Sequence, residues 1–289
     1  MDIFAQLVAN SLIAGAIYTL ITLGFNLIFG ATRFINMAHG SYAAVGAYGA
    51  FFVLRGMGWG ILPSMILGTL AGGAAGALSD IFVFKPLRKR RAKPLAHFVA
   101  SLGLFTVAQA ILSVIFSSQF FLLSDSQGGR VFEIAGASVT GVQLWIIGLA
   151  LAVSVTSFFL MRFTMFGKVI RALSDDEEVA KMLGINTNRV ISWIFFLGAA
   201  LAGFAGVLVG MDTGIQPNMG LFIVIEGAIP SIVGGIGNMA GGVLGAFLLG
   251  FVENFAIWFI PSQWKGAIAF GLLTLFLIFR PQGILGKSK

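Results

Sequence analysis

Long apolar runs separated by short polar stretches dominate the chain. A helix needs about 20 residues to cross a bilayer, and two of the runs, 38–54 and 221–236, are shorter than that. We expect those two to be tilted, broken or re-entrant. The pattern predicts an all-α fold, a polytopic transmembrane helical bundle with eight or nine spans in one domain over residues 1–289. The runs cover approximately residues 7–30, 38–54, 60–84, 95–118, 141–161, 190–211, 221–236, 240–260 and 264–280.

The composition supports a membrane protein and removes several kinds of chemistry. Of 289 residues, 58% are hydrophobic and 10% are charged, whereas soluble domains carry roughly 25% charged residues. The 39 glycines suit closely packed membrane helices. With no cysteine and two histidines, thiolate and histidine-rich metal sites are excluded, and no cofactor is expected.

Charge distribution predicts the topology. Basic residues concentrate in 85–93, 162–189 and 280–289, and such clusters mark cytoplasmic loops and suit anionic lipid headgroups. The net charge of +7 is therefore a membrane signal and not a nucleic-acid signal. The nearly uncharged loop 119–140 belongs on the far side. The N-terminus is then periplasmic and the C-terminus cytoplasmic; Arg33 falls inside, as expected, while Arg55 falls outside, against the rule.

One stretch inside the basic loop 162–189 reads as a short water-soluble helix from Ser174 to Gly184. Its four consecutive acids, at 175–178, suit the first turn of a helix. Ser174 with Glu177 three residues later predicts a capping box, and Gly184 predicts the residue after the helix. The helix is interpreted as a contact for a soluble partner or as a connector lying on its own membrane domain. Its apolar face consists of Val179, Met182 and Leu183.

Polar residues inside the apolar runs are few and costly to bury. They are interpreted as lining a polar cavity, or as capping broken helices and coupling helices to one another; for His39 we expect a structural hydrogen bond. The stretches 36–40 and 238–242 share Asn-Met-Ala at a break. Duplicated interrupted helices point to a transport site, although chance matching is an alternative. The candidate pathway residues are Asn36, His39, Gly40, Glu226, Asn238, Gly241 and Glu253.

No catalytic constellation is readable. The chain has no HExxH, no P-loop and no local Ser-His-Asp arrangement. Transport driven by ATP would therefore need an ATPase on another chain. A stand-alone carrier driven by H⁺ or Na⁺ is the main alternative, and a membrane-embedded enzyme is a further one.

Four motifs in order resemble the permease subunits of branched-chain amino-acid ABC importers, the hydrophobic amino-acid uptake class, a family that also includes permeases for urea and short amides. They lie at 15–48, 168–208, 234–253 and 279–287. The short chain, ending soon after Phe-Arg-Pro-Gln-Gly, is similar to the H-type subunit. Ser41 stands where the family often has an acidic residue. The substrate therefore stays open among Leu, Ile, Val, other amino acids, urea and short amides, and simple-sugar ABC permeases are a second alternative.

The resemblance implies a bacterial inner-membrane permease that is not itself an enzyme. It implies a second, M-type permease subunit, two cytoplasmic ATP-binding subunits and a periplasmic solute-binding protein as partners. The family's coupling helix corresponds to the loop from Arg171 to Ile185. The coupling role is carried onto Arg171, Ser174, Asp175, Asp176, Glu177, Glu178, Lys181 and Gly184.

Overall fold

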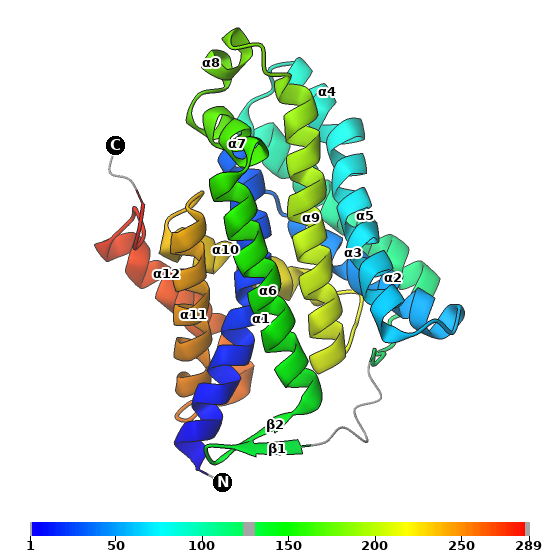
Figure 1. Cartoon of the computed structure of the whole chain (residues 1–289), viewed down its shortest axis with the longest axis vertical. Helices are drawn as coiled ribbons and strands as arrows, with labels where there is room; N and C mark the ends of the chain where they lie inside the picture. The colour runs from blue at the N-terminus through cyan, green and yellow to red at the C-terminus, as the bar shows by residue number, and fades with distance from the viewer. Residues whose placement is uncertain (1, 124–130, 287–289) are drawn as a thin grey trace.

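The computed structural model describes residues 2–123 and 131–286, and it is a helical bundle (Figure 1). All nine predicted apolar runs are helical, because a segment in lipid must satisfy its own backbone hydrogen bonds. The helices of the first half are α1 (Ile3–Thr32), α2 (His39–Phe51), α3 (Ile61–Ser79), α4 (Lys85–Lys89) and α5 (Pro94–Phe116). Those of the second half are α6 (Gly141–Phe163), α7 (Met165–Asp175), α8 (Glu177–Met182), α9 (Thr187–Asp212), α10 (Met219–Gly234), α11 (Met239–Ala256) and α12 (Lys265–Phe279).

The spans differ in length as predicted. In the described part of the chain, seven helical stretches are long and apolar enough to cross a membrane. The two short runs became α2, with 13 residues, and α10, with 16. π-helical turns extend two of the helices, at Phe52–Gly56 after α2 and at Asp80–Phe84 between α3 and α4. The polytopic helical fold is thus confirmed.

A small β-hairpin in loop 119–140 was not predicted. Strand β1 (Val131–Ile134) pairs antiparallel with β2 (Ala137–Thr140). The two turn residues, Ala135 and Gly136, have φ of 50° and 87°, which is the left-handed geometry that two-residue hairpin loops need. The N–H of Asp2 donates to the carbonyl of Gly136 at 3.0 Å, so the hairpin packs at the start of α1. Residues 124–130 of this loop lie outside the described residues.

Two groups of helices repeat one packing arrangement in opposite directions. The first group consists of α1, α2 and α3, and within it α2 packs on α3. The second group consists of α9, α10 and α11, and within it α10 packs on α11. The first helix of each group packs most extensively on the third helix of the other group: α1 packs on α11, and α9 packs on α3. Helices α1 and α9 begin at opposite ends of the molecule and run antiparallel (Figure 1). This is the inverted repeat that many transport proteins share.

The turns before α2 and α10 are counterparts in this repeat. In both, the N–H of the first helical residue donates to a carbonyl three residues earlier, at 3.2 Å in 36–39 and 3.0 Å in 216–219. The second helical residues, Gly40 and Gly220, meet at the crossing. A Cβ on Gly40 would lie 1.9 Å from the carbonyl oxygen of Gly220, and one on Gly220 would lie 2.8 Å from that of Gly40.

The pairing of 36–40 with 238–242 is therefore wrong. The break before α2 corresponds to the break before α10, whose sequence, Gln-Pro-Asn-Met-Gly, offers only a weak match. The similar residues at 238–242 have a different structural role. The Asn238 side chain caps α11 by accepting from the N–H of Gly241 at 3.1 Å. The duplication is evident in how the helices pack, but the sequences of the two groups show little similarity.

The predicted cytoplasmic segments lie at one end of the molecule. Helices α4, α7 and α8 gather there, opposite the N-terminus and the hairpin (Figure 1). The described part of the tail also packs at this end, where the N–H of Leu285 donates to the carbonyl of Gly234 at 2.9 Å and Gly237 approaches Gly30 near the end of α1. Residues 287–289 of the tail cluster lie outside the described residues. Within the described chain, the three basic clusters thus share one side.

Candidate functional site

The predicted capped helix is in fact the end of one helix and the whole of another. Ser174 lies inside α7, and Asp176 is the residue that caps α8. The Asp176 carboxylate accepts from the backbone N–H groups of Glu178 and Val179, at 2.8 and 3.1 Å. The capping box on Ser174 is therefore wrong. The reason is the apolar stripe of α7, which runs from Phe166 and carries the helix past Ser174.

Helix α7 is anchored to the membrane bundle. It buries Ile170 and Leu173, and a Cβ on Gly167 would meet the carbonyl oxygen of Met161 at 2.0 Å, so α7 lies very close to the end of α6. The Arg171 guanidinium donates to the carbonyls of Met161 and Arg162, which have no helical partner of their own there. Two of the predicted coupling residues, Arg171 and Ser174, thus belong to the part of the loop that packs on the bundle.

Helix α8, in contrast, projects from the bundle. Its apolar side chains face outward: Val179, Met182 and Leu183 are 50%, 83% and 72% exposed. Ala180 is its one buried residue. Glu177 and Lys181 form an ion pair at 2.7 Å along the helix. Gly184 has φ of 81°, which confirms its place as the residue after the helix.

The two intramembrane glutamates lie together, and they share a partner that the sequence reasoning missed. The Tyr18 hydroxyl of α1 contacts Glu253 Oε2 of α11 at 2.7 Å and Glu226 Oε1 of α10 at 3.4 Å. Glu253 is buried and Glu226 is partly exposed. This arrangement supports the coupling of three helices. A tyrosine in the middle of an apolar run, which needs a partner for its hydroxyl, was the available signal.

Asn36, His39 and Gly40 form a second, separate place. His39 Nε2 lies 3.1 Å from the carbonyl oxygen of Ile21, which confirms the expected structural hydrogen bond. Asn36 Oδ1 accepts from the N–H of Ala38 at 3.1 Å and so orders the turn before α2. Gly40 permits the close crossing with α10.

A third place surrounds Asn26 and includes Asn238 and Gly241. Asn26 Oδ1 accepts from Ser231 Oγ at 2.5 Å and from the N–H of Gly237 at 2.8 Å, and its Nδ2 donates to the carbonyl of Asn238 at 3.1 Å. A Cβ on Gly241 would lie 2.1 Å from the carbonyl oxygen of Gly234. The seven candidate pathway residues therefore occupy three distinct places in the bundle.

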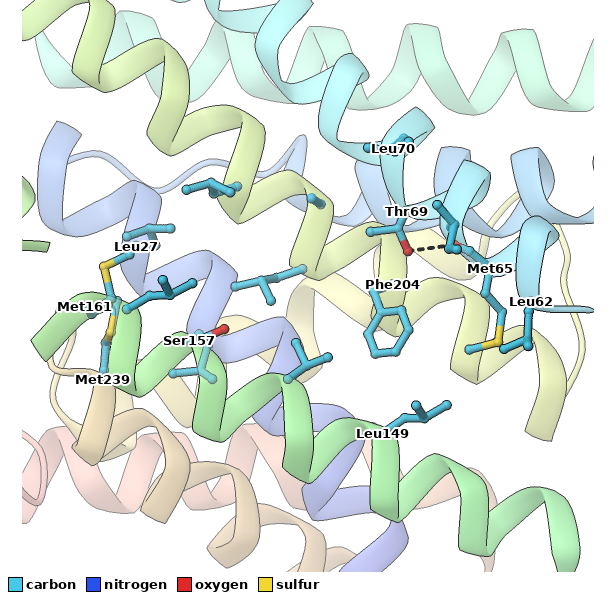
Figure 2. A pocket seen from close by; sticks show the side chains of 17 residues that line it. Leu27, Leu62, Met65, Thr69, Leu70, Leu149, Ser157, Met161, Phe204 and Met239 are labelled. Atoms are coloured by element: carbon cyan, nitrogen blue, oxygen red, sulfur yellow. Dashed lines mark hydrogen bonds between the residues drawn. The ribbon is translucent and has the colours of Figure 1, made fainter. Parts of the chain in front are cut away.

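A lateral groove of about 420 Å³ lies between α1, α3, α6 and α9 (Figure 2). Its lining is almost wholly apolar, and none of the seven candidate pathway residues belongs to it. Thr69 hydrogen-bonds to the carbonyl of Met65 in its own helix, at 2.8 Å. Such a surface offers a charged or strongly polar molecule almost no hydrogen-bond partner. Leu62 and Phe204 mark one end of the groove, and Leu27 and Met161 mark the other.

These features define a class of protein: an integral membrane protein of transporter architecture, with an inverted helical repeat and a projecting helix at its basic end. A family model described as branched-chain amino acid transport system / permease component matches residues 7–277. The chain belongs to this family.

Curated relatives span nearly the same length. The chain is 30% identical to the high-affinity branched-chain amino acid transport system permease protein LivH of Escherichia coli (strain K12), over 99% of this chain and 96% of that protein. It is 33% identical to the corresponding permease protein BraD of Pseudomonas aeruginosa, over 99% and 97%.

Solved structures support the fold alone. One is PsaBC from Streptococcus pneumoniae in complex with Fab, with a TM-score of 0.55, 12% identity, and coverage of 98% of this chain and 93% of that one. Another is an inward-facing conformation of a putative metal-chelate type ABC transporter, with a TM-score of 0.53, 19% identity, and coverage of 94% and 85%.

Proposed function

We propose that this chain is the H-type permease subunit of an ABC importer that moves branched-chain amino acids across the bacterial inner membrane, with α8 as its coupling helix. The observation that carries the proposal is the outward apolar face of α8. Val179, Met182 and Leu183 contribute an exposed apolar patch at the end of the molecule where the basic loops gather. Exposed apolar patches with polar surroundings mark protein interaction sites. The substrate is proposed from the names of LivH and BraD.

The partner for this face is an ATPase on another chain, because the sequence has no P-loop. ATP binding would push α8, and the bundle would alternate between outward-open and inward-open states through its differential affinity for the ATPase. By this proposal the basic end is cytoplasmic and the hairpin end, with the N-terminus, is periplasmic. A periplasmic binding protein would deliver the amino acid there.

The pathway is proposed at the interface with a second permease subunit. Glu226 is partly exposed in a membrane-embedded helix, and a charge facing lipid costs roughly 2.5–3.5 kcal/mol on insertion scales. A polar surface contributed by a partner subunit removes that cost. The lateral groove is a poor pathway because its lining has almost no polar group for a zwitterion.

The test compares two substitutions in the reconstituted importer with both permease subunits, the ATPase and the binding protein. Gly184→Val strains a backbone at φ of 81°, and a Cβ there meets nothing within 4 Å, so the bundle is undisturbed. Glu177→Lys removes the ion pair with Lys181. Both are expected to lower leucine uptake per ATP hydrolysed and to leave membrane insertion intact. Normal coupled uptake by both variants would contradict the coupling role.

The stand-alone carrier is tested in the same liposomes. The permease alone, with an H⁺ or Na⁺ gradient and no ATPase, is expected to give no leucine uptake. Uptake under those conditions would contradict the proposal and favour an ion-driven carrier.

A further inference from the structure

Arg33 joins the end of α7 to the break between α1 and α2. It follows α1 as its C-cap, with φ of 55°, a left-handed backbone that arginine rarely adopts. From there its guanidinium Nη2 donates to the main-chain carbonyl of Ser174. That carbonyl belongs to the last turn of α7, where the helix dipole is negative and attracts a cation. The unusual backbone is thus combined with a specific long-range bond.

Packing supports the same junction. Ile170 and Leu173 of α7 are buried in a hydrophobic cluster at the basic end. This cluster includes Phe34, the residue after Arg33, and Phe84. The Phe34 ring lies 5.1 Å from the ring of Phe84 and 5.1 Å from that of His97. The hydrophobic cluster at the basic end is separate from the larger cluster that fills the middle of the bundle.

The turn 33–38 is also bonded on its far side. The N–H of Met37 donates to Ser101 Oγ of α5 at 3.0 Å, and Asn36 orders the start of α2. One short turn therefore touches α7 through Arg33, α5 through Met37 and α2 through Asn36. A displacement of α7 that keeps the Arg33 bond must move this turn and with it the ends of two membrane helices.

We infer that Arg33 is a positioning residue for transport: it makes turn 33–38 move together with the end of α7 and so passes the motion of the coupling segment to α2 and α5. This inference rests on the proposed function, because it needs an ATPase that moves α7 and α8. It assigns Arg33 no contact with substrate or with the ATPase.

The first test replaces the guanidinium and keeps the backbone. Asparagine tolerates the left-handed region, so Arg33→Asn removes the bond to Ser174 with little strain. Arg91→Asn is the matched control, since Arg91 is exposed and has φ of 52° in the basic loop at the same end. In the reconstituted importer, Arg33→Asn is expected to lower leucine transported per ATP by about tenfold. Arg33→Lys keeps the charge and recovers part of the loss, while Arg91→Asn matches the wild type.

The second test replaces the bond with a disulfide. The chain has no cysteine, and a Cβ on Gly30 would lie 3.3 Å from Ser174 Oγ, which suits a cross-link. Oxidised Gly30→Cys/Ser174→Cys is expected to restore coupling to Arg33→Asn, and reduction is expected to abolish that rescue. With Arg33 present, oxidation is expected to leave transport unchanged, because the joined segments already move together.

The outcomes separate this inference from the proposed function. No ATP-driven uptake by the wild-type assembly would overturn the proposed function, and this inference with it. With uptake present, an unchanged transport ratio in Arg33→Asn, or an equal loss in Arg91→Asn, would overturn the role of Arg33 alone. If Arg33→Asn does not fold, the cross-link in the wild-type background decides, and a block of transport by oxidation would contradict the inference.

Discussion

The membrane bundle and the projecting helix α8 use opposite means of packing. In the bundle, helices cross with their backbones in contact, as where a Cβ on Gly206 of α9 would lie 2.1 Å from the carbonyl oxygen of Ala43 in α2. At α8, Met182 is 83% exposed and a Cβ on Gly184 meets nothing within 4 Å. The interior of the bundle is closed by such contacts, whereas the apolar face of α8 is exposed at the basic end. Stability therefore resides in the first region, and partner recognition is expected to reside in the second.

The largest expected loss of stability comes from a glycine crossing. Gly206→Val places a branched side chain against the backbone of α2, and overpacking of this kind is expected to cost about 3 kcal/mol. The matched control is Gly103→Val in α5, where a Cβ meets nothing within 4 Å. The measurement is the thermal unfolding of the purified permease in detergent. Equal unfolding temperatures for the two variants would remove the contrast between packed and open glycines.

A smaller loss of stability is expected from a substitution at Asn26, whose hydrogen bonds form a node between helices. Asn26→Ala removes three hydrogen bonds that join α1 to the junction of α10 and α11. It takes away the partner of the buried Ser231 hydroxyl and of the Gly237 N–H, at about 2 kcal/mol. In the control, Asn254→Ala, the lost bond is to Gly250 within the same helix. Unfolding of the two variants at the same denaturant concentration would show that the node does not join the repeats.

The smallest change in global stability is expected at the cap of α8. Asp176→Ala removes the two bonds that start the helix, at about 1 kcal/mol locally. Global unfolding of the permease should not change, because α8 packs weakly on the bundle. Coupled uptake should fall, while Asp175→Ala, one residue earlier, should have little effect. A larger loss of coupled uptake in Asp175→Ala than in Asp176→Ala would contradict the assignment of Asp176 as the cap of a separate helix α8.

The bundle was predictable from the sequence because lipid leaves the backbone few choices. Each apolar run had to be a helix, and the basic clusters had to share a side. The hairpin at 131–140 was missed because its strands are short and its loop carries almost no pattern. The inverted repeat was mislocated because the stretch 238–242 shares Asn-Met-Ala with the break at 36–40, although its asparagine caps α11 and the corresponding break lies before α10.

The cap of the projecting helix was predicted at the wrong residue because several neighbouring residues are able to cap a helix. Ser174, Asp175 and Asp176 can each cap a helix, and only the apolar stripe of α7 decides which one does. Gly184 was placed correctly because a residue with φ of 81° after a helix strongly favours glycine. The partners Tyr18 and Asn26 became evident only once helices distant in sequence were side by side. Whether any of these residues contacts substrate stays a prediction.

The most direct test of the central claim is the retention of the ATPase by a permease with a charge on α8. Met182→Glu alters a side chain that is 83% exposed, and the control Met165→Glu alters one that is 74% exposed at the start of α7. Neither change should affect unfolding of the permease alone. If α8 is the docking helix, Met182→Glu loses the co-purifying ATPase and Met165→Glu keeps most of it. Full retention by Met182→Glu would contradict the assignment of α8 as the ATPase docking site.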